Sequence, residues 1–517
     1  MNFTGMKIAA LALTFTALLG GCTLTERLES AEDDTPVQTA ATGEKESIGL
    51  AYYAAEKVNP VLSTSEINTI LCDALYEGLF VLDETFTPQP VLCEDYTVSA
   101  DGKVYTFTVR DGISFWSGEA LTAADVAETY RLIKNSPGTR YYSRMSEVTH
   151  ITARDARTVE ITLALPNADF ASLLDIPIFR SGTQDEPFAD GTGSFRPVKE
   201  NGEYRLEAFS GWHGEANPEI DEIALITTVR AKSVMYSFST GDVSMTRAER
   251  ISDDPVSLSG AVDVYQTPST ELHYLGVNMK GELTAQPAFR LGLCALIDRT
   301  AICEGALQTY ADPALLPCNP QPETVTAQAL GADAEQALAY FAQIGLTDSN
   351  NDGFLDYAKT GYRTRQPVTL TLLVNSENTY KQAVLAQVCL SLNQVGIQTE
   401  VVSVDFETYL AELAAGNYDL YYGDVVLQPD FDMRALLATG GKLNYGGYAD
   451  PVMDGKLTAA RADGAAQTAL YEYFLEQMPI VPIAFERKQV VLRGGLLQNY
   501  STAPAQMFIS YPRWRWG

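Results

Sequence analysis

The sequence has little histidine and none of the common catalytic motifs. Its three histidines, His150, His213 and His273, are scattered through 517 residues, and none stands in an HExxH pattern. A histidine-rich metal site is therefore not expected. A Walker A loop, a GxGxxG turn after a strand and a GxSxG nucleophile elbow are also missing. The sequence predicts a protein that is not an enzyme and that needs no cofactor.

Positive charge is scarce as well. The chain has 36 Lys and Arg against 66 Asp and Glu, a formal net charge of −30. Phosphate backbones repel such a chain, which excludes nucleic acid as a partner. The same field attracts cationic ligands only weakly at physiological salt. The hydrophobic share of 46% and the length of the chain predict two or three well-packed domains.

Long apolar runs are confined to the N-terminus. Ile8 to Leu19 follow Lys7 and form an apolar run that is too short for a membrane span and typical of a signal-peptide core. The run ends in Leu19-Gly20-Gly21-Cys22, which resembles a bacterial lipobox. We predict a lipoprotein signal peptide at 1–21 and a lipid on Cys22. A disordered tether at 22–46 would then hold the chain outside the cytoplasmic membrane, in the cell envelope. A plain signal peptide with a chance cysteine is the alternative.

The other cysteines form no recognisable pattern. None stands in a CxxC, and six cysteines allow about 15 pairings. Large exported domains do not depend on disulfides as small ones do. The sequence does not decide between free thiols and disulfides for these cysteines, which are Cys72, Cys93, Cys294, Cys303, Cys318 and Cys389.

Strands and helices alternate in the C-terminal half. Residues 368–374, 398–404 and 418–422 have strand character, and the two intervening segments, 378–395 and 406–416, are amphipathic. This β-α-β-α-β succession predicts a parallel sheet covered by helices.

Three longer helices and one interrupted strand are expected elsewhere. The apolar spacing predicts single helices at 65–79, 287–308 and 458–477. Residues 263–277 have strand character that Pro268 is expected to break, because proline cannot donate to a strand ladder.

A set of short motifs occurs in a fixed order from about residue 48 to 490. Together they resemble the family-5 extracellular solute-binding proteins, the oligopeptide-, dipeptide- and nickel-binding subunits of ABC importers. The motifs are Leu75-Tyr76-Glu77-Gly78-Leu79, Asp101-Gly102-Lys103-Val104-Tyr105-Thr106-Phe107, Arg110-Asp111-Gly112-Ile113-Ser114-Phe115, Ser117-Gly118-Glu119-Ala120-Leu121-Thr122, Gly191-Thr192-Gly193-Ser194-Phe195, Ser239-Thr240-Gly241-Asp242-Val243, Phe289-Arg290 and Ile297-Asp298-Arg299.

The resemblance implies an α/β type II periplasmic-binding-protein fold in its three-domain variant, with two lobes that close on a ligand about a hinge. The two crossovers between lobes are expected near 266–270 and 479–483. Domain I would take 47–82, 188–268 and 480–517, domain II 83–187, and domain III 269–479.

The resemblance also indicates where the solute binds. Peptide-binding members carry an aspartate in domain III that pairs with the peptide's amino group. Here Leu427 stands at that position, and Asp424 replaces a tryptophan of the family pattern. We therefore expect Asp424, Asp430 or Asp432 to meet an amine from a shifted position. The alternative is that Asp430 and Asp432 cap a helix that begins near Met433.

Aromatic residues complete the predicted solute site. Tyr141 and Tyr142 lie in a loop that matches a pocket-lining segment of the family, and the run from Thr270 to Tyr274, just past the first crossover, matches another. Tyr422 precedes Asp424 in the same strand. Tyrosines offer stacking area and a hydroxyl, although surface aromatics on a loop are the alternative for the pair at 141 and 142.

One segment resembles a calcium loop. Asp348, Asn350, Asp352 and Asp356 place oxygen ligands at alternate positions, and Gly353 stands sixth. The twelfth residue is Lys359 where a bidentate glutamate belongs, so an Asx-rich turn is the stronger interpretation and no metal site is predicted.

The leading hypothesis is a lipid-anchored monomer that captures a peptide-like or amine-bearing solute and delivers it to an ABC permease in the membrane. A surface sensor or interaction lipoprotein on the same scaffold, without transport, is the alternative. A hydrolase is disfavoured by the missing nucleophile and base.

Overall fold

The computed structural model describes residues 47–217, 219–252 and 260–517, which belong to one compact unit. The predicted signal peptide, Cys22 and the tether lie outside the described residues. Within the described ranges, no helix combines the length and the apolar character that crossing a membrane requires.

The first sheet joins the start of the described chain to strands that follow much later. β1 runs parallel to β12, and β11 and β10 continue the sheet in antiparallel pairs. Its buried side chains include Ile48, Leu206 and Ile223. The strands are β1 (Ile48–Tyr52), β10 (Phe195–Glu200), β11 (Glu203–Ala208) and β12 (Glu222–Thr227).

Helix α1 (Glu66–Leu75) begins where it was predicted and ends four residues earlier. Ser65 caps it by accepting from the backbone N–H of Asn68, and Tyr76 is already extended. The chain then forms β2 (Glu77–Gly78), which pairs with Pro177 and Ile178, and a side chain at position 78 would lie only 2.9 Å from the Ile176 carbonyl oxygen.

The second sheet is antiparallel, in the order β5-β6-β8-β7. The sequence predicts strands at 104–109, from their alternating apolar pattern, and at 158–165. Both are confirmed, and Tyr105, Phe107 and Val109 point into the core. Thr122, with Asp125 three residues later, predicts a helix N-cap, and a capping box between these two residues confirms it. The elements are β5 (Cys93–Val98), β6 (Val104–Val109), α2 (Ala123–Lys134), β7 (Val148–Ala153) and β8 (Thr158–Leu163).

The largest sheet has the order β13-β21-β14-β20-β18-β19, with β15 paired to β21. β18 is parallel to β19 and to β20, so the predicted β-α-β-α-β arrangement is confirmed. The sheet as a whole is mixed, because β14 is antiparallel to β20 and β21. The elements are β13 (Met245–Ala248), β14 (Val262–Val277), β15 (Ala311–Pro313), β18 (Thr369–Asn375), α8 (Thr379–Gln394), β19 (Gln398–Val404), α9 (Phe406–Ala415), β20 (Leu420–Val426) and β21 (Ile480–Arg493).

Two of the predicted single helices are wrong, because aspartates start new helices within them. The 287–308 segment forms α4 (Pro287–Leu296) and α5 (Arg299–Glu304), since the Asp298 side chain accepts from the backbone of Ala301. The 458–477 segment forms the end of α11 (Pro451–Ala462), a short 3-10 turn capped by Asp463, and α12 (Gln467–Gln477).

Shorter elements connect these units. They are β2 (Glu77–Gly78), β3 (Phe80–Leu82), β4 (Pro88–Pro90), η1 (Tyr142–Met145), η2 (Phe170–Leu174), β9 (Pro177–Ile178), α3 (Ala231–Thr240), α6 (Ala327–Leu330), α7 (Ala334–Gln343), β16 (Asp356–Tyr357), β17 (Gln366–Pro367), α10 (Arg434–Leu437), η3 (Gly464–Ala466), β22 (Leu497–Gln498), η4 (Tyr511–Arg513) and β23 (Arg515–Trp516).

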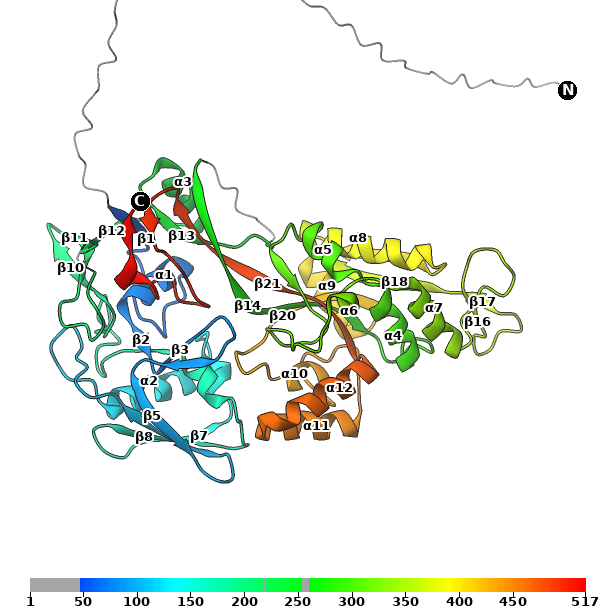
Figure 1. The fold of residues 1–517 in the computed structure, drawn as a ribbon, viewed down its shortest axis with the longest axis horizontal. Coiled ribbons are helices and arrows are strands. Elements are labelled where there is room, and N and C mark those ends of the chain that lie inside the picture. The colour runs from blue at the N-terminus through cyan, green and yellow to red at the C-terminus, as the bar shows by residue number, and fades with distance from the viewer. Residues whose placement is uncertain (1–46, 218, 253–259) are drawn as a thin grey trace, which may run out of the picture. The chain divides into compact units, whose positions relative to one another are not determined.

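The described chain has two main hydrophobic cores, and one strand pair runs through both. In the core built around β18 and β20 lie Leu272 of β14 and Phe485 of β21, whereas Leu492 of β21 packs in the core of the first two sheets. Figure 1 shows β14 and β21 side by side between the two groups of elements. The predicted break at Pro268 is wrong: β14 continues, and only its register against β21 shifts between Pro268 and Leu272.

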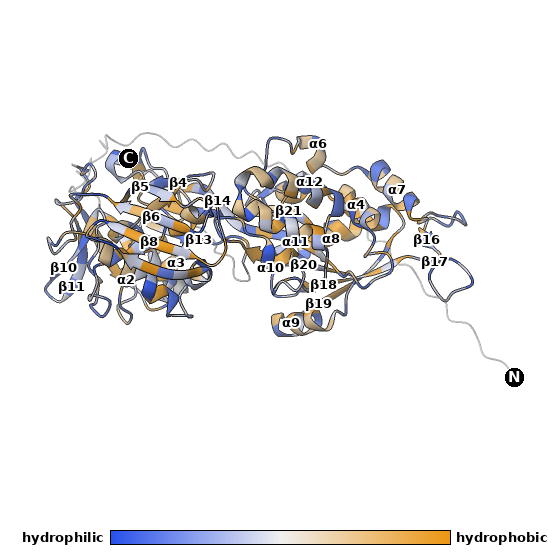
Figure 2. Ribbon diagram, turned by 90° about the horizontal axis from the view of Figure 1, so that it is seen from below, coloured by the Kyte–Doolittle hydropathy of each residue, from blue (hydrophilic) through white to orange (hydrophobic). Residues whose placement is uncertain are grey.

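Hydrophobic and polar residues are distributed differently over the strands and the helices. In Figure 2 the hydrophobic residues concentrate on strands, most visibly β6 and β8, while the helices carry both hydrophobic and polar residues. The six cysteines of the described ranges are buried and unpaired. Burial raises the pKa of the Cys72 and Cys93 thiols to about 12, so these thiols stay protonated and unreactive.

Candidate functional site

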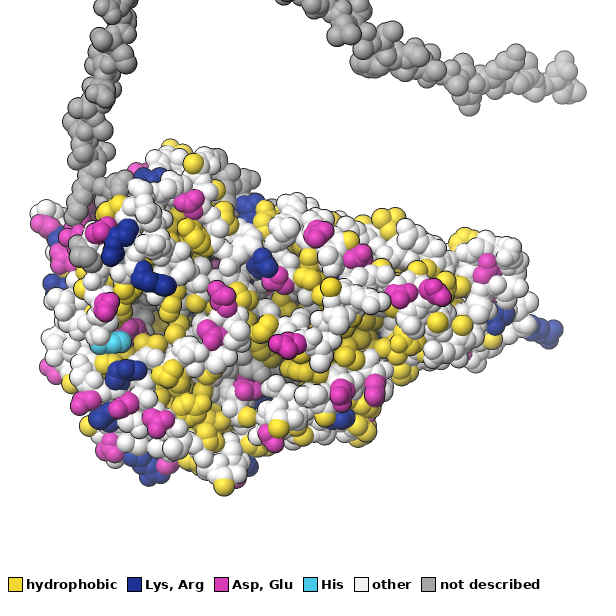
Figure 3. Space-filling model, in the orientation of Figure 1, with side chains coloured by type: hydrophobic (Ala, Val, Ile, Leu, Met, Phe, Trp, Pro, Cys, Tyr) yellow, Lys and Arg dark blue, Asp and Glu magenta, His cyan; other side chains and the backbone are white. Residues whose placement is uncertain are grey.

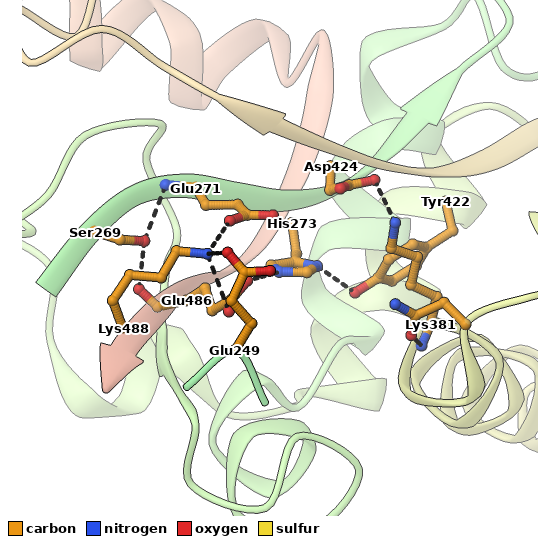
Figure 4. Close-up of polar contacts among 10 residues, drawn as sticks. Glu249, Ser269, Glu271, His273, Lys381, Tyr422, Asp424, Glu486 and Lys488 are labelled. Carbon is orange, nitrogen blue, oxygen red and sulfur yellow. Dashed lines mark hydrogen bonds and ion pairs between the residues drawn. The ribbon is translucent and has the colours of Figure 1, made fainter. Parts of the chain in front are cut away.

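Five polar side chains meet where β20, β14 and β21 lie next to one another, and we call them the strand cluster (Figure 4). Tyr422 Oη lies 3.1 Å from His273 Nδ1, and His273 Nε2 lies 3.7 Å from a Glu486 carboxylate oxygen. The Lys488 ammonium donates to Glu271 at 2.6 Å and to Glu486 at 3.3 Å. The antiparallel pairing of β14 with both neighbours places these side chains together.

Burial governs the electrostatics of the strand cluster. The His273 and Glu486 residues are 0% and 1% exposed. Burial, helped by the nearby Glu271 charge, raises the pKa of Glu486. Burial opposes the charge of Lys488, yet the Glu271 and Glu486 carboxylates hold the pKa of its ammonium above the usual range. Burial also raises the pKa of Tyr422 well above its ordinary value, so its hydroxyl remains protonated.

A second group of polar residues lines a cavity of about 370 Å³ that we call the sheet-edge pocket. The pocket lies at the carboxyl ends of β18 and β20, the edge at which open α/β sheets commonly bind ligands. Asp424 accepts from the Lys381 ammonium of α8 at 2.8 Å. The residues that line the sheet-edge pocket are Tyr274, Asn375, Glu377, Lys381, Phe406, Tyr409, Leu410, Leu413, Tyr421, Gly423, Asp424, Val425, Leu443 and Tyr445.

The segment after β20 makes a third group, which joins elements of the two hydrophobic cores. Asp430 accepts from the Asn167 amide at 2.9 Å, and Arg434 donates to Asp432 at 2.7 Å and to Glu147 at 3.1 Å. Arg461 strengthens the junction, because its guanidinium donates to the Pro166 carbonyl at 2.9 Å and its own carbonyl accepts from Ala168.

The two aspartates of this segment differ in their affinity for a proton. Burial and the neighbouring Asp432 charge raise the pKa of Asp430 to about 6. Burial also acts on Asp432, but the hydrogen bonds from Arg434 hold the pKa of that carboxyl below its usual range. The prediction that both cap a helix is only partly met: α10 begins at Arg434 with Met433 as its N-cap, and Asp432 alone accepts from the backbone N–H of Arg434.

The predicted aromatic residues are distributed over different places. Tyr422 is buried in the strand cluster, and the Thr270 carbonyl accepts from the backbone of Leu427, beside the predicted acidic segment. Tyr141 stacks against the guanidinium groups of Arg140 and Arg144, at 4.8 and 5.1 Å from its ring centre, and Tyr142 is 40% exposed. Neither Tyr141 nor Tyr142 lines the sheet-edge pocket as described.

The structure adds three residues that the sequence did not single out, namely His273, Lys381 and Glu486. His273 lies in the run from Thr270 to Tyr274 that the family resemblance indicated, but nothing local marks its pairing with a strand over 200 residues later. Lys381 lies in the first turn of α8, where the prediction of the helix was correct but no partner could be inferred.

The segment that resembles a calcium loop forms a hydrogen-bonded turn. Asp348 accepts from the backbone N–H groups of Asp352 and Gly353, and Asp352 accepts from Asn350 and Phe354. These carboxylates are used by the turn itself, as in an Asx-rich loop. This hydrogen bonding agrees with the Asx-rich turn, which the sequence favoured over a calcium site for Asp348, Asn350, Asp352 and Asp356.

Acidic side chains are spread over the molecular surface. On the face in Figure 3, aspartates and glutamates are scattered among hydrophobic and neutral groups and do not gather in one patch. The polar groups described above are therefore distinguished by their geometry and burial, not by a local excess of surface charge.

Comparison with known proteins gives a consistent result. Residues 87–446 match the family model of bacterial extracellular solute-binding proteins, family 5 Middle. The chain is 25% identical over 472 residues to the glutathione-binding protein GsiB of Salmonella typhi, covering 83% of this chain and 87% of that protein. It is 22% identical over 496 residues to the oligopeptide-binding protein AppA of Bacillus subtilis, covering 88% and 89%.

Solved structures share the fold. A nickel ABC transporter protein of Bacillus halodurans superposes with a TM-score of 0.72 at 20% identity, covering 90% of this chain and 98% of that one. The CtaP substrate-binding protein of Listeria monocytogenes superposes with a TM-score of 0.69 at 17% identity, covering 91% and 99%.

Proposed function

Because the chain belongs to the bacterial extracellular solute-binding proteins of family 5, we propose that it captures a peptide-like or amine-bearing solute and delivers it to an ABC permease. The predicted α/β type II periplasmic-binding-protein fold is confirmed by the likeness to solved members. The protein is a solute-binding protein and not an enzyme. The observation that carries the solute class is the near full-length similarity to glutathione- and oligopeptide-binding relatives.

The sheet-edge pocket supports this solute class. Its paired Asp424 carboxylate and Lys381 ammonium offer one group to a solute amine and one to a solute carboxylate, as a zwitterionic peptide requires. Tyr274 and Tyr409 add aromatic walls, and about 370 Å³ falls within the usual size of small-ligand pockets. Asp424 thus stands in for the aspartate that Leu427 replaces.

A hinge in the β14–β21 pair accounts for closure over the solute. We place the crossover on β14 between Pro268 and Leu272, where its register shifts, and on β21 opposite to it, at Phe485–Arg487. This second position is several residues later than the sequence predicted, because Ile480 to Phe485 pack in the β18–β20 core. With this change at the C-terminal boundary, the three-domain division set out above remains our proposal.

The remaining features of the proposal concern the cell envelope. A signal peptide at 1–21, a lipid on Cys22 and a tether at 22–46 would hold a monomeric binding protein close to its permease. The lipobox-like run Leu19-Gly20-Gly21-Cys22 supports this arrangement.

A binding screen tests the solute class. Thermal unfolding is measured with short peptides, glutathione, free amino acids and uncharged sugars, and hits are titrated by calorimetry. We expect a peptide or amino compound to raise the unfolding temperature, and Asp424→Asn to weaken its binding at least tenfold. Glu400→Gln is the matched control, since Glu400 is an exposed carboxylate on β19 of the same sheet. Stabilisation by sugars alone would overturn the proposed solute class.

A further inference from the structure

The strand cluster contains a group of potential metal ligands that solute binding does not use. Glu271, His273 and Glu486 each offer a ligand atom, and these atoms lie within 4.8 Å of one another. Among the residues that the structure describes, this is the one such group of three or more. It lies on β14 and β21 and none of its members lines the sheet-edge pocket.

Two of the three ligand atoms are buried without a hydrogen-bond partner in the described structure. His273 Nε2 and Glu486 Oε2 have side chains 1% and 2% exposed and face each other at 3.7 Å. That separation is too long for a hydrogen bond. It is close to the about 3.4 Å that two ligand atoms keep around a tetrahedral zinc ion with bonds near 2.1 Å. Leaving both atoms without a hydrogen bond is costly, and one cation between them satisfies both.

The orientation of His273 suits a metal ligand. Tyr422 Oη lies 3.1 Å from Nδ1 and can accept the Nδ1 proton, which leaves the Nε2 lone pair directed at the carboxylates. A ligating histidine usually makes such a hydrogen bond through its second ring nitrogen. Tyr422 is buried, and its backbone carbonyl accepts from the Tyr409 hydroxyl of α9, so its phenol is a fixed support for the ring.

The charge of the group also favours a divalent cation. Two carboxylates, Glu271 and Glu486, face the single ammonium of Lys488, which leaves one surplus negative charge. The Lys488 side chain is 38% exposed and lies 3.9 Å from Glu249, so it can move toward that exposed carboxylate and open the position between the ligands. Lys488 is therefore a competitor for the site.

We propose that Glu271, His273 and Glu486 bind a first-row divalent metal ion, zinc being the best match to one imidazole and two carboxylates, with water as the remaining ligand. The bound ion ties β14 to β21 next to the register shift between Pro268 and Leu272. It holds the strand pair that runs through both cores, and it does so whichever solute the protein carries.

Metal titration of the full-length chain tests the proposal. The protein is stripped with a chelator and titrated with Zn²⁺ by calorimetry and with Co²⁺ by absorption spectroscopy. We expect one ion per chain. His273→Gln should weaken binding about 100-fold, and Tyr422→Phe about tenfold because it removes the support of the ring. Lys488→Met should strengthen binding about tenfold or more, since it removes the competing ammonium.

The matched control is His213→Gln, which removes the histidine of another His–Glu pair, 3.0 Å from Glu77. We expect it to leave metal affinity unchanged. If His273→Gln does not fold, the gain of affinity in Lys488→Met still decides the question. The proposal is overturned by the absence of stoichiometric binding, by affinities equal in all variants, or by a Co²⁺ spectrum with thiolate charge-transfer bands, which places the ion on cysteine.

Discussion

The burial of Asp430 makes the stability of this protein depend on pH. Asp430 follows β20 and Asn167 precedes the 3-10 turn η2, so their 2.9 Å hydrogen bond joins elements of the two cores. Burial and the Asp432 charge raise the pKa of Asp430 from 3.8 to about 6. The perturbation is Asp430→Asn, which removes the charge and preserves the shape of the side chain.

The sign and size follow from proton linkage. A carboxyl with a raised folded-state pKa binds its proton more tightly in the folded protein than in the unfolded chain. Its contribution to stability is therefore most favourable below pH 4 and is lost as the pH rises to about 6. A shift of about two units corresponds to about 3 kcal/mol. The amide keeps the bond from Asn167 but loses the longer one from the Asp432 backbone at 3.3 Å, which costs about 1 kcal/mol.

Urea unfolding between pH 4 and pH 7.5 measures the effect. Asp430→Asn should be about 2 kcal/mol more stable than the native chain at pH 7.5, and the difference should disappear or reverse at pH 4. Asp432→Asn is the matched control two residues away. Its pKa is lowered by Arg434, so the variant should be less stable than the native chain at pH 7.5 and approach it at low pH. A difference for Asp430→Asn that does not change with pH would refute this account.

Three further variants test the fold and the anchor. Arg299→Lys should lower the free energy of unfolding by about 3 kcal/mol in urea titrations. The buried guanidinium donates to the carbonyls of Ala314 and Pro482, and a lysine cannot reach both. Unchanged stability would contradict this role. Gly276→Ala should lower the free energy of unfolding by about 3 kcal/mol in the same assay, since the new methyl group would lie 1.9 Å from the Tyr421 ring. An unchanged free energy would show that the ring moves freely. Cys22→Ser should release the protein from membranes into the soluble fraction on fractionation, whereas continued retention would contradict the lipid anchor.

Much of the fold could be predicted from local patterns. The alternation at 104–109, the capping box at Thr122 and the strand–helix succession from 368 onward depend on residues close in sequence, and the structure confirms them. The errors lie where apolar spacing continues across a break. At 287–308 the apolar pattern persists, but Asp298 starts a new helix, and a cap of this kind outweighs spacing.

The candidate site was less predictable, because its partners come from distant strands. The sequence pointed to Asp424, and the structure places it in a pocket with Lys381, a residue whose role depends on where α8 packs. His273 and Glu486 meet only through the pairing of β14 with β21, more than 200 residues apart. A short-range pattern carries no information about such a contact.

Solute identity is the central claim, and a crystal structure of the protein purified with its native solute tests it most directly. The account predicts a peptide or amine-bearing compound in the sheet-edge pocket, with its ammonium group within hydrogen-bond distance of the Asp424 carboxylate and its body against Tyr274 and Tyr409. A solute without an amine, or one bound away from Asp424, would contradict it.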